Sequence, residues 1–452
     1  MDRQRPFRLA VAASLIGVAA GAAAAVFLWS LEHVTRLHWE HPELLFLLPL
    51  AGLLSGVVYA RIGGLAEGGT ELILREVRKP AAGVPGRMAP LVLAGTLVTH
   101  LCGGSAGREG TAVQMGASLA AVLARWLRVP SGDLPKLLTC GLAAGFAAVF
   151  GTPLAGAVFA LEVSTGRPAG EHSGARVRRF VRLLTSLLLC LLAAVVAHET
   201  AKRLGVGHTH YRIAGFGDGH SSRGFLPASS SELVRFAAAA GVAGVAFGLS
   251  AGMFIILRNT IRALFRKHVS RVWMRPVIGG IAVVLLAVLT HDTSSLGLGV
   301  EASPQRPDNV CIRSCLEADP VGWLTWFRKL LFTAVTVGSG FKGGEVTPLF
   351  FVGAALGNFL SGHLAIPTGL LAAMGFVAVF AGAARTPLAC SLMALEVFGS
   401  AHPELLSFSF LGPTALCCLV AARCSGPNSI YDSESPFPPS PLPGCRLSQH
   451  LS

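Results

Sequence analysis

The sequence predicts an all-α integral membrane protein, a bundle of many, partly discontinuous membrane helices. We expect it to be built from two homologous repeats that are inverted relative to each other. Three observations predict this fold class. Only 13% of the 452 residues are charged and 52% are hydrophobic, whereas a soluble protein carries about 25% charged residues. Apolar segments follow one another along almost the whole chain, and one series of motifs occurs twice.

Most of the apolar segments are shorter than a membrane span or are interrupted by Gly and Pro. A spanning helix needs about 20 apolar residues. Short, broken segments are typical of discontinuous helices that end near the middle of the membrane, around a binding site. The first segment is too long for a signal sequence, so we expect a retained membrane helix. The segments are 8–30, 43–62, 89–101, 111–127, 136–149, 153–164, 180–198, 232–257, 276–291, 327–338, 347–361, 368–382, 386–398 and 404–422.

A repeated series of motifs indicates two homologous halves. Residues 145–163 contain GFAAVF, TPLA and ALEV in that order, and residues 375–397 contain GFVAVF, TPLA and ALEV. The glutamate of each ALEV motif, Glu162 or Glu396, ends an apolar segment, and we expect both to lie at an interface. In transporters built from repeats, the binding site lies between the repeats.

The composition also suggests how the chain is divided. We expect a first membrane repeat at 1–215, a polar connector at 216–231 and a second membrane repeat at 232–431. The segment 432–452 is rich in Pro and Ser and is expected to be disordered, because it cannot form a core.

The net charge of +13 comes from basic residues clustered between apolar runs. This pattern fits loops on the cytoplasmic side of a membrane. It argues against nucleic-acid binding, because no soluble domain remains to carry a basic face. No metal or other cofactor is expected, because the cysteines lack the spacing of a metal site. One basic cluster, expected in a loop, consists of Arg258, Arg262, Arg266, Lys267, Arg271 and Arg275.

A Gly-rich, charged break precedes each copy of the repeat. In the first, Glu109 lies between Arg108 and Gly110, directly before an apolar run. Glycines let backbone N–H groups approach a ligand, and a helix start offers free N–H donors to an anion. A carboxylate there would occupy the anion site when it is empty, and protonation would release it. The alternative is that Glu109 is a first-turn residue at the membrane surface.

The second break has the same features. Gly343, Gly344 and Glu345 are followed by Thr347 and Pro348 at the start of an apolar helix. Proline suits a first helical position, and the threonine hydroxyl can donate a hydrogen bond to an anion. Two such helix starts, one from each half, could meet at one dehydrated anion.

These motifs resemble those of the CLC family of chloride channels and anion/proton antiporters over residues 10–432. The segment Gly107–Gly110 is similar to the CLC motif Gly-Lys/Arg-Glu-Gly, whose glutamate is the external gate. Gly343–Pro348 corresponds to the anion-binding motif Gly-x-Phe-x-Pro, and Tyr431 resembles the tyrosine that contacts the anion. The resemblance implies a multi-pass protein of a bacterial-type inner membrane. It also implies a homodimer in the lipid bilayer that transports a halide anion.

Departures from the chloride pattern resemble the fluoride/proton antiporter branch of the family. Val346 replaces the motif phenylalanine, Gly68 takes the place of the chloride-binding serine, and Val163 replaces an inner glutamate. The sequence GGEVTP at 343–348 is typical of that branch, where its Glu and Thr belong to the ion pathway. The implied anion and proton pathway consists of Glu109, Glu345, Val346, Thr347, Tyr431, Arg108 and Gly110, with backbone anion-binding turns at Gly107, Gly343, Gly344 and Gly68.

The resulting hypothesis is fluoride export coupled to proton import. The alternatives are a chloride/proton antiporter and a passive voltage-gated chloride channel, because all three use one scaffold. A distant alternative is a membrane serine hydrolase, since Gly103, Ser105 and Gly107 match the Gly-x-Ser-x-Gly nucleophile motif.

Overall fold

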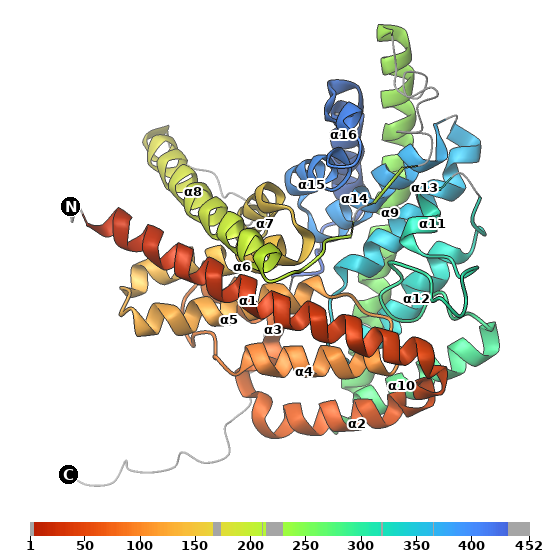
Figure 1. Ribbon diagram of the computed structural model, residues 1–452, viewed down its shortest axis with the longest axis horizontal. Helices are drawn as coiled ribbons and strands as arrows, with labels where there is room; N and C mark the ends of the chain where they lie inside the picture. Colours follow the sequence, from red (N-terminus) through yellow and green to blue (C-terminus); the bar gives the residue numbers. More distant parts are fainter. Residues whose placement is uncertain are drawn as a thin grey trace.

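The computed structural model describes residues 4–165, 173–209, 211–213, 229–317, 320–364 and 366–432 (Figure 1). Within these ranges the regular structure is helical, with no strand beyond two isolated bridges. This confirms the all-α fold class. Most of the expected connector at 216–231, and the expected tail after residue 432, lie outside the described residues.

Each half of the chain forms its own series of helices. The first half contains α1 (Arg5–Glu40), η1 (Pro42–Leu47), α2 (Leu48–Val58), η2 (Tyr59–Gly63), η3 (Gly64–Gly68), α3 (Gly69–Arg78), α4 (Met88–Leu101), α5 (Glu109–Trp126), η4 (Ser131–Asp133), α6 (Leu134–Phe150), α7 (Pro153–Thr165) and α8 (Ser173–Arg203). The second half contains α9 (Ser230–His268), η6 (Val272–Met274), α10 (Arg275–Thr290), α11 (Ile312–Cys315), α12 (Thr325–Gly338), α13 (Val346–Leu364), α14 (Thr368–Ala384), α15 (Pro387–Gly399), η7 (Pro403–Leu406) and α16 (Phe408–Cys424).

Long apolar helices occur together with short ones, as the interrupted segments predict. Among the described residues, six helical runs are long and apolar enough to cross a membrane. Others, including α4, α7 and α15, have only 10–17 residues. Local sequence sets some of these ends. Helix α6 ends at Gly151, which adopts a left-handed conformation (φ 74°), and Pro153 then opens α7 at a position that needs no N–H donor.

The two halves pack in the same way. Helix α1 packs against α8 and α6, and α9 packs against α16 and α14. Helices α5 and α6 form a close pair, as do α13 and α14. Both close pairs meet at glycines, because a Cβ on Gly116 would lie 2.2 Å from the Gly141 carbonyl and one on Gly353 would lie 2.0 Å from the Gly375 carbonyl. Small residues at such crossings let membrane helices approach closely.

Helices α7 and α15 join the two halves through reciprocal caps. The Glu162 carboxylate of α7 accepts hydrogen bonds from the backbone N–H groups of Leu388 (3.2 Å) and Ala389 (2.8 Å), at the start of α15. The Glu396 carboxylate of α15 accepts from the N–H groups of Leu154 (2.9 Å) and Ala155 (2.7 Å), at the start of α7. Each carboxylate satisfies free donors at the positive end of a helix dipole.

This exchange requires α7 and α15 to run antiparallel and to present the same surface to each other. Such a self-complementary contact is what a two-fold relation produces, and the two repeats are therefore inverted. Figure 1 shows α7 and α15 meeting where the first half (red to yellow-green) adjoins the second half (green to blue). Both glutamates lie at an interface, as expected.

The structure differs from the expectation for one basic cluster. Helix α9 continues through Arg258, Arg262 and Arg266 and ends only at His268, so this part of the cluster is helical and does not form a loop. Arg258 is 5% exposed, which makes it a buried cation of the bundle. This part of α9 cannot be predicted from the pattern of apolar residues alone. Its basic residues count as polar in that pattern, although their aliphatic stems also cover apolar surface.

We predict that Glu162→Ala and Glu396→Ala each lower the free energy of unfolding by about 1–2 kcal/mol, because each leaves two helix-start donors without their carboxylate. Melting of the purified variants in detergent measures the effect, with Glu199→Ala at an exposed position of α8 as the control. A loss in only one of the two variants would contradict the symmetric role of the caps.

Candidate functional site

Two helix starts, one from each half, meet in the middle of the molecule. Helix α5 begins at Glu109 and α13 at Val346. The turns before them exchange two backbone hydrogen bonds, since the N–H of Gly107 donates to Gly344 O and the N–H of Gly344 donates to Gly107 O, both at 2.6 Å. A Cβ on Gly344 would lie 2.8 Å from the Gly110 nitrogen. The approach therefore requires glycine at this position.

The Glu109 carboxylate occupies the N-terminus of α13. Its side chain is fully buried, with 0% exposure. The Thr347 hydroxyl donates to Glu109 Oε1 at 2.5 Å, and the Thr347 backbone N–H donates to Oε2 at 3.1 Å. The N–H of Arg108 also donates to Oε2, at 3.2 Å. These are the donors that an anion bound at this helix start would use.

A large cavity leads toward this carboxylate. Its volume is about 1600 Å³, and its wall includes the second half of α1, the segment 287–313, His100 and Arg108. The Arg108 guanidinium nitrogen Nε lies 3.4 Å from Glu109 Oε1. A cation therefore stands between the cavity and the buried carboxylate, where its charge attracts anions.

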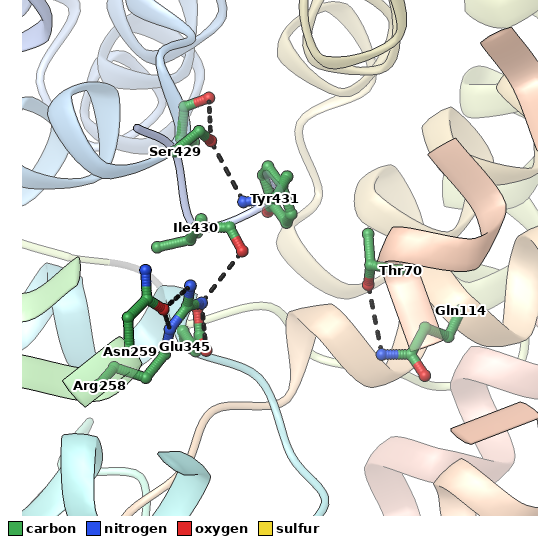
Figure 2. A network of polar contacts seen from close by, with 9 residues as sticks. Thr70, Gln114, Arg258, Asn259, Glu345, Ser429, Ile430 and Tyr431 are labelled. Atoms are coloured by element: carbon green, nitrogen blue, oxygen red, sulfur yellow. Dashed lines mark hydrogen bonds and ion pairs between the residues drawn. The ribbon is translucent and has the colours of Figure 1, made fainter. Parts of the chain in front are cut away.

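The carboxylate of the second break faces a different partner. Both Glu345 oxygens accept hydrogen bonds from Arg258 Nη1, at 2.9 Å each. The Glu345 side chain is 14% exposed, whereas that of Glu109 has no exposure. Thr347 in the first turn of α13 thus contacts Glu109, while Glu345, just before α13, pairs with a cation of α9. Figure 2 shows this pair together with Asn259 and Ile430.

Tyr431 lies on the segment that follows α16. Its ring is partly buried and meets the ring of Phe159 edge-on, with the centroids 6.0 Å apart. The Tyr431 N–H donates to the Ser429 hydroxyl at 3.2 Å. In the close-up, Tyr431 lies between the Arg258–Glu345 pair and the Thr70–Gln114 pair (Figure 2).

Gly68 belongs to a third helix start, since it directly precedes α3. The adjoining residue Gly69 adopts φ 51°, and a Cβ there would lie 3.3 Å from the Gln114 side chain of α5. Gln114 Nε2 donates to the Thr70 hydroxyl at 3.3 Å. Thr70 and Gln114 were not predicted as site residues. Two sequence features could have identified them: Thr70 directly follows a pair of glycines, and Gln114 is the one amide in the apolar run 111–127.

The two valines that replace expected polar or aromatic residues are both buried. Val346, the first residue of α13, is 3% exposed and belongs to the main core. Val163 of α7 is 6% exposed, and its carbonyl oxygen accepts a hydrogen bond from Arg78 Nη2 at 2.9 Å. The position of the inner glutamate of chloride/proton exchangers therefore supplies no titratable side chain in this chain.

The geometry is wrong for the hydrolase alternative. Helix α4, and not a strand, precedes the Gly-x-Ser-x-Gly sequence. The Ser105 hydroxyl bonds to the Thr333 hydroxyl at 2.9 Å. The two ring nitrogens of His100 lie 2.8 Å from Thr96 O and 3.0 Å from Ala106 O. Ser105 and His100 thus do not form the hydrogen-bonded pair that activates a nucleophile.

We predict that Gly344→Ala lowers the free energy of unfolding by about 1–3 kcal/mol, because the new methyl group meets backbone that cannot move aside. Gly362→Ala is the control, since Gly362 lies on α13, the helix that Gly344 precedes, and a Cβ there meets nothing within 4 Å. Melting temperatures of the two variants check this. Equal melting temperatures would contradict the tight contact between the two helix starts.

Comparison with known proteins agrees with this fold. Residues 51–426 match the family model described as voltage gated chloride channel. The chain is 39% identical over 429 residues to a chloride/fluoride channel protein of Pseudomonas syringae pv. tomato, covering 93% of this chain and 85% of that protein. It is 26% identical over 454 residues to an H⁺/Cl⁻ exchange transporter of Vibrio vulnificus, covering 94% and 89%.

Solved structures give the same result. The crystal structure of a CLC-type fluoride/proton antiporter superimposes with a TM-score of 0.80 at 31% identity, covering 95% of this chain and 98% of that one. A slow cyanobacterial Cl⁻/H⁺ antiporter shares the fold, with a TM-score of 0.70 at 19% identity over 92% and 94%. These relatives are named as channels, transporters and antiporters. The chain therefore belongs to the CLC, or voltage-gated chloride channel, family and is a multi-pass membrane protein that transports anions.

Proposed function

We propose that this protein exports fluoride in exchange for protons. The observation that carries the proposal is the contact between Glu109 and Thr347. The fully buried Glu109 carboxylate accepts hydrogen bonds from the hydroxyl and the backbone N–H of Thr347, in the first turn of α13. The arrangement supplies one site that either the carboxylate or a small anion can fill, together with a group that can carry a proton.

The chemistry of fluoride suits this site. Fluoride is small, strongly hydrated and the conjugate base of a weak acid, so it needs strong hydrogen-bond donors to replace its water. The Thr347 hydroxyl and the free N–H groups at the start of α13 are such donors. Two relatives support the choice of anion, since one is named a chloride/fluoride channel protein and one a fluoride/proton antiporter.

The exchange follows from competition for one position. An anion at the start of α13 displaces the Glu109 carboxylate toward the cavity at Arg108, where water can protonate it. Once the anion has left, the neutral acid returns to the vacant site and brings its proton with it. Binding of anion and proton are thereby linked, because each favours the state that the other needs.

Glu345 is the second protonatable group in this proposal. The position of the inner glutamate on α7 is Val163, which has no titratable group. The Glu345 side chain is partly exposed, whereas that of Glu109 is not. We assign the Tyr431 hydroxyl to the lining of the pathway, and we assign Gly68, Gly107, Gly343 and Gly344 to the turns that let backbone approach the anion.

The assembly is part of the same proposal. We propose that the chain works as a homodimer in the lipid bilayer, with one pathway per subunit and no enzymatic activity. The domain limits remain a first repeat at 1–215, a connector at 216–231, a second repeat at 232–431 and a tail at 432–452.

Ion flux from liposomes tests the proposal. Purified protein is reconstituted with internal fluoride or chloride, and anion efflux and external pH are recorded together. We expect fluoride efflux well above chloride efflux, with protons moving inward. Chloride efflux with protons moving inward would indicate a chloride/proton antiporter, and chloride efflux with no proton movement would indicate a passive channel. Either result would contradict fluoride/proton exchange.

We predict that Glu109→Gln abolishes proton movement, because the amide fills the same space but carries no titratable proton. The same liposome assay measures it, with Glu199→Gln on the exposed side of α8 as the control. Unchanged proton influx in the Glu109→Gln variant would refute the role of this carboxylate.

A further inference from the structure

We propose that Arg258 is a positioning residue that links the protonation state of Glu345 to the position of the segment carrying Tyr431. The inference rests on the proposed function, in which Glu345 takes part in proton transfer. It concerns a residue that sequence patterns place in a basic loop and that the structure places inside the bundle.

One guanidinium group holds two separate segments of the chain. Arg258 Nη1 donates to both Glu345 oxygens at 2.9 Å and to the carbonyl oxygen of Ile430 at 3.0 Å. Glu345 precedes α13, and Ile430 precedes Tyr431. Figure 2 shows the guanidinium between these two segments. The break before α13 and the tyrosine segment are thus attached to the same side chain of α9.

The rest of the guanidinium is fixed as well. Arg258 Nε and Nη2 donate to Asn259 Oδ1 at 3.0 and 2.7 Å, and the residue is 5% exposed. This planar set of donors suits arginine, because the single ammonium of lysine cannot reach all these acceptors in the same geometry. A buried cation with this many directed bonds sets the positions of its partners.

The pair lies close to a second opening of the molecule. A pocket of about 320 Å³ is lined by residues of α9, including Asn259, Thr260 and Lys267, and by Asn428 of the segment after α16. Asn259 is the hydrogen-bond partner of Arg258, and Asn428 lies two residues before Ile430. This pocket does not share lining residues with the large cavity at Arg108. The Arg258–Glu345 pair thus adjoins, through Asn259, a pocket that is separate from the cavity at Arg108.

Protonation of Glu345 changes what Arg258 can hold. The ionised carboxylate accepts both hydrogen bonds and balances the charge of the guanidinium. When a proton binds to one carboxylate oxygen, the group becomes neutral and the ion pair is lost. Arg258 keeps its bonds to the Ile430 carbonyl and to Asn259, but only the unprotonated oxygen of the neutral Glu345 remains a good acceptor, so the tie between the break before α13 and the Tyr431 segment is weakened. Other titratable side chains whose charge acts on Glu345 include Arg262 of α9 and Tyr431.

A double-mutant cycle in liposomes tests the inference. Arg258→Met, Glu345→Gln and the double variant are compared with the wild type for fluoride efflux and for the ratio of fluoride to protons. We expect Arg258→Met to slow efflux at least about tenfold, since it leaves a buried carboxylate without its cation, and to change the ratio. The double variant should be no slower than Glu345→Gln alone, because the two residues act as one unit.

Two further variants separate positioning from charge and from folding. Arg262→Met removes a positive charge one turn further along α9, at an exposed position, that acts on Glu345 only through space, and it is expected to change the ratio less than Arg258→Met does. Arg258→Lys keeps the charge but not the geometry and should restore efflux only in part, which keeps the test usable if Arg258→Met does not fold.

Three results would overturn the inference. In the first, the losses from Arg258→Met and Glu345→Gln multiply in the double variant. In the second, Arg262→Met changes the ratio as much as Arg258→Met. In the third, Arg258→Lys behaves like the wild type. If the wild type itself moves no protons, the proposed function fails first, whatever Arg258 does.

Discussion

The contact between Gly107 and Gly344 determines the geometry of the whole site. The two backbones exchange hydrogen bonds of 2.6 Å, and no side chain larger than hydrogen fits between them. Because the turns touch, the first turn of α13 lies against the start of α5, and the Thr347 donors reach the Glu109 carboxylate. The inverted repeat makes such a meeting possible, since it brings equivalent helix starts from the two halves to one place. The reciprocal caps at Glu162 and Glu396 connect the same halves at α7 and α15.

The two carboxylates near the site have different surroundings. Glu109 has no exposure and takes its hydrogen bonds from neutral donors of α13 and from the Arg108 backbone. Glu345 is partly exposed and is balanced by a guanidinium. The large cavity includes Arg108, while a separate pocket adjoins Asn259. A charge at membrane depth is costly unless it is paired. The partners of Glu109 are hydrogen-bond donors at the start of α13, and the partner of Glu345 is the Arg258 guanidinium.

Much of this architecture could be predicted from the sequence, because apolar runs and repeated motifs are local patterns. The helix starts at Glu109 and Val346 follow from glycine-rich breaks before apolar runs, and so does the expectation that both belong to one site. The pairing of Arg258 with Glu345 could not be predicted, because 87 positions separate them and Arg258 lies in a run of basic residues typical of a loop. The Thr70–Gln114 contact depends on the packing of α3 against α5. The motif pattern does not encode that packing.

The central claim is that the Glu109 carboxylate and the transported anion compete for the start of α13. Proton uptake on anion binding tests it most directly. Fluoride is titrated into unbuffered, detergent-solubilised protein while pH is recorded, and the protein-free titration is subtracted. The account predicts that binding takes up as much as about one proton per chain, because the displaced carboxylate becomes protonated, and that Glu109→Gln binds fluoride with no uptake. Fluoride binding to the wild type without proton uptake, or equal uptake in the variant, would contradict the account.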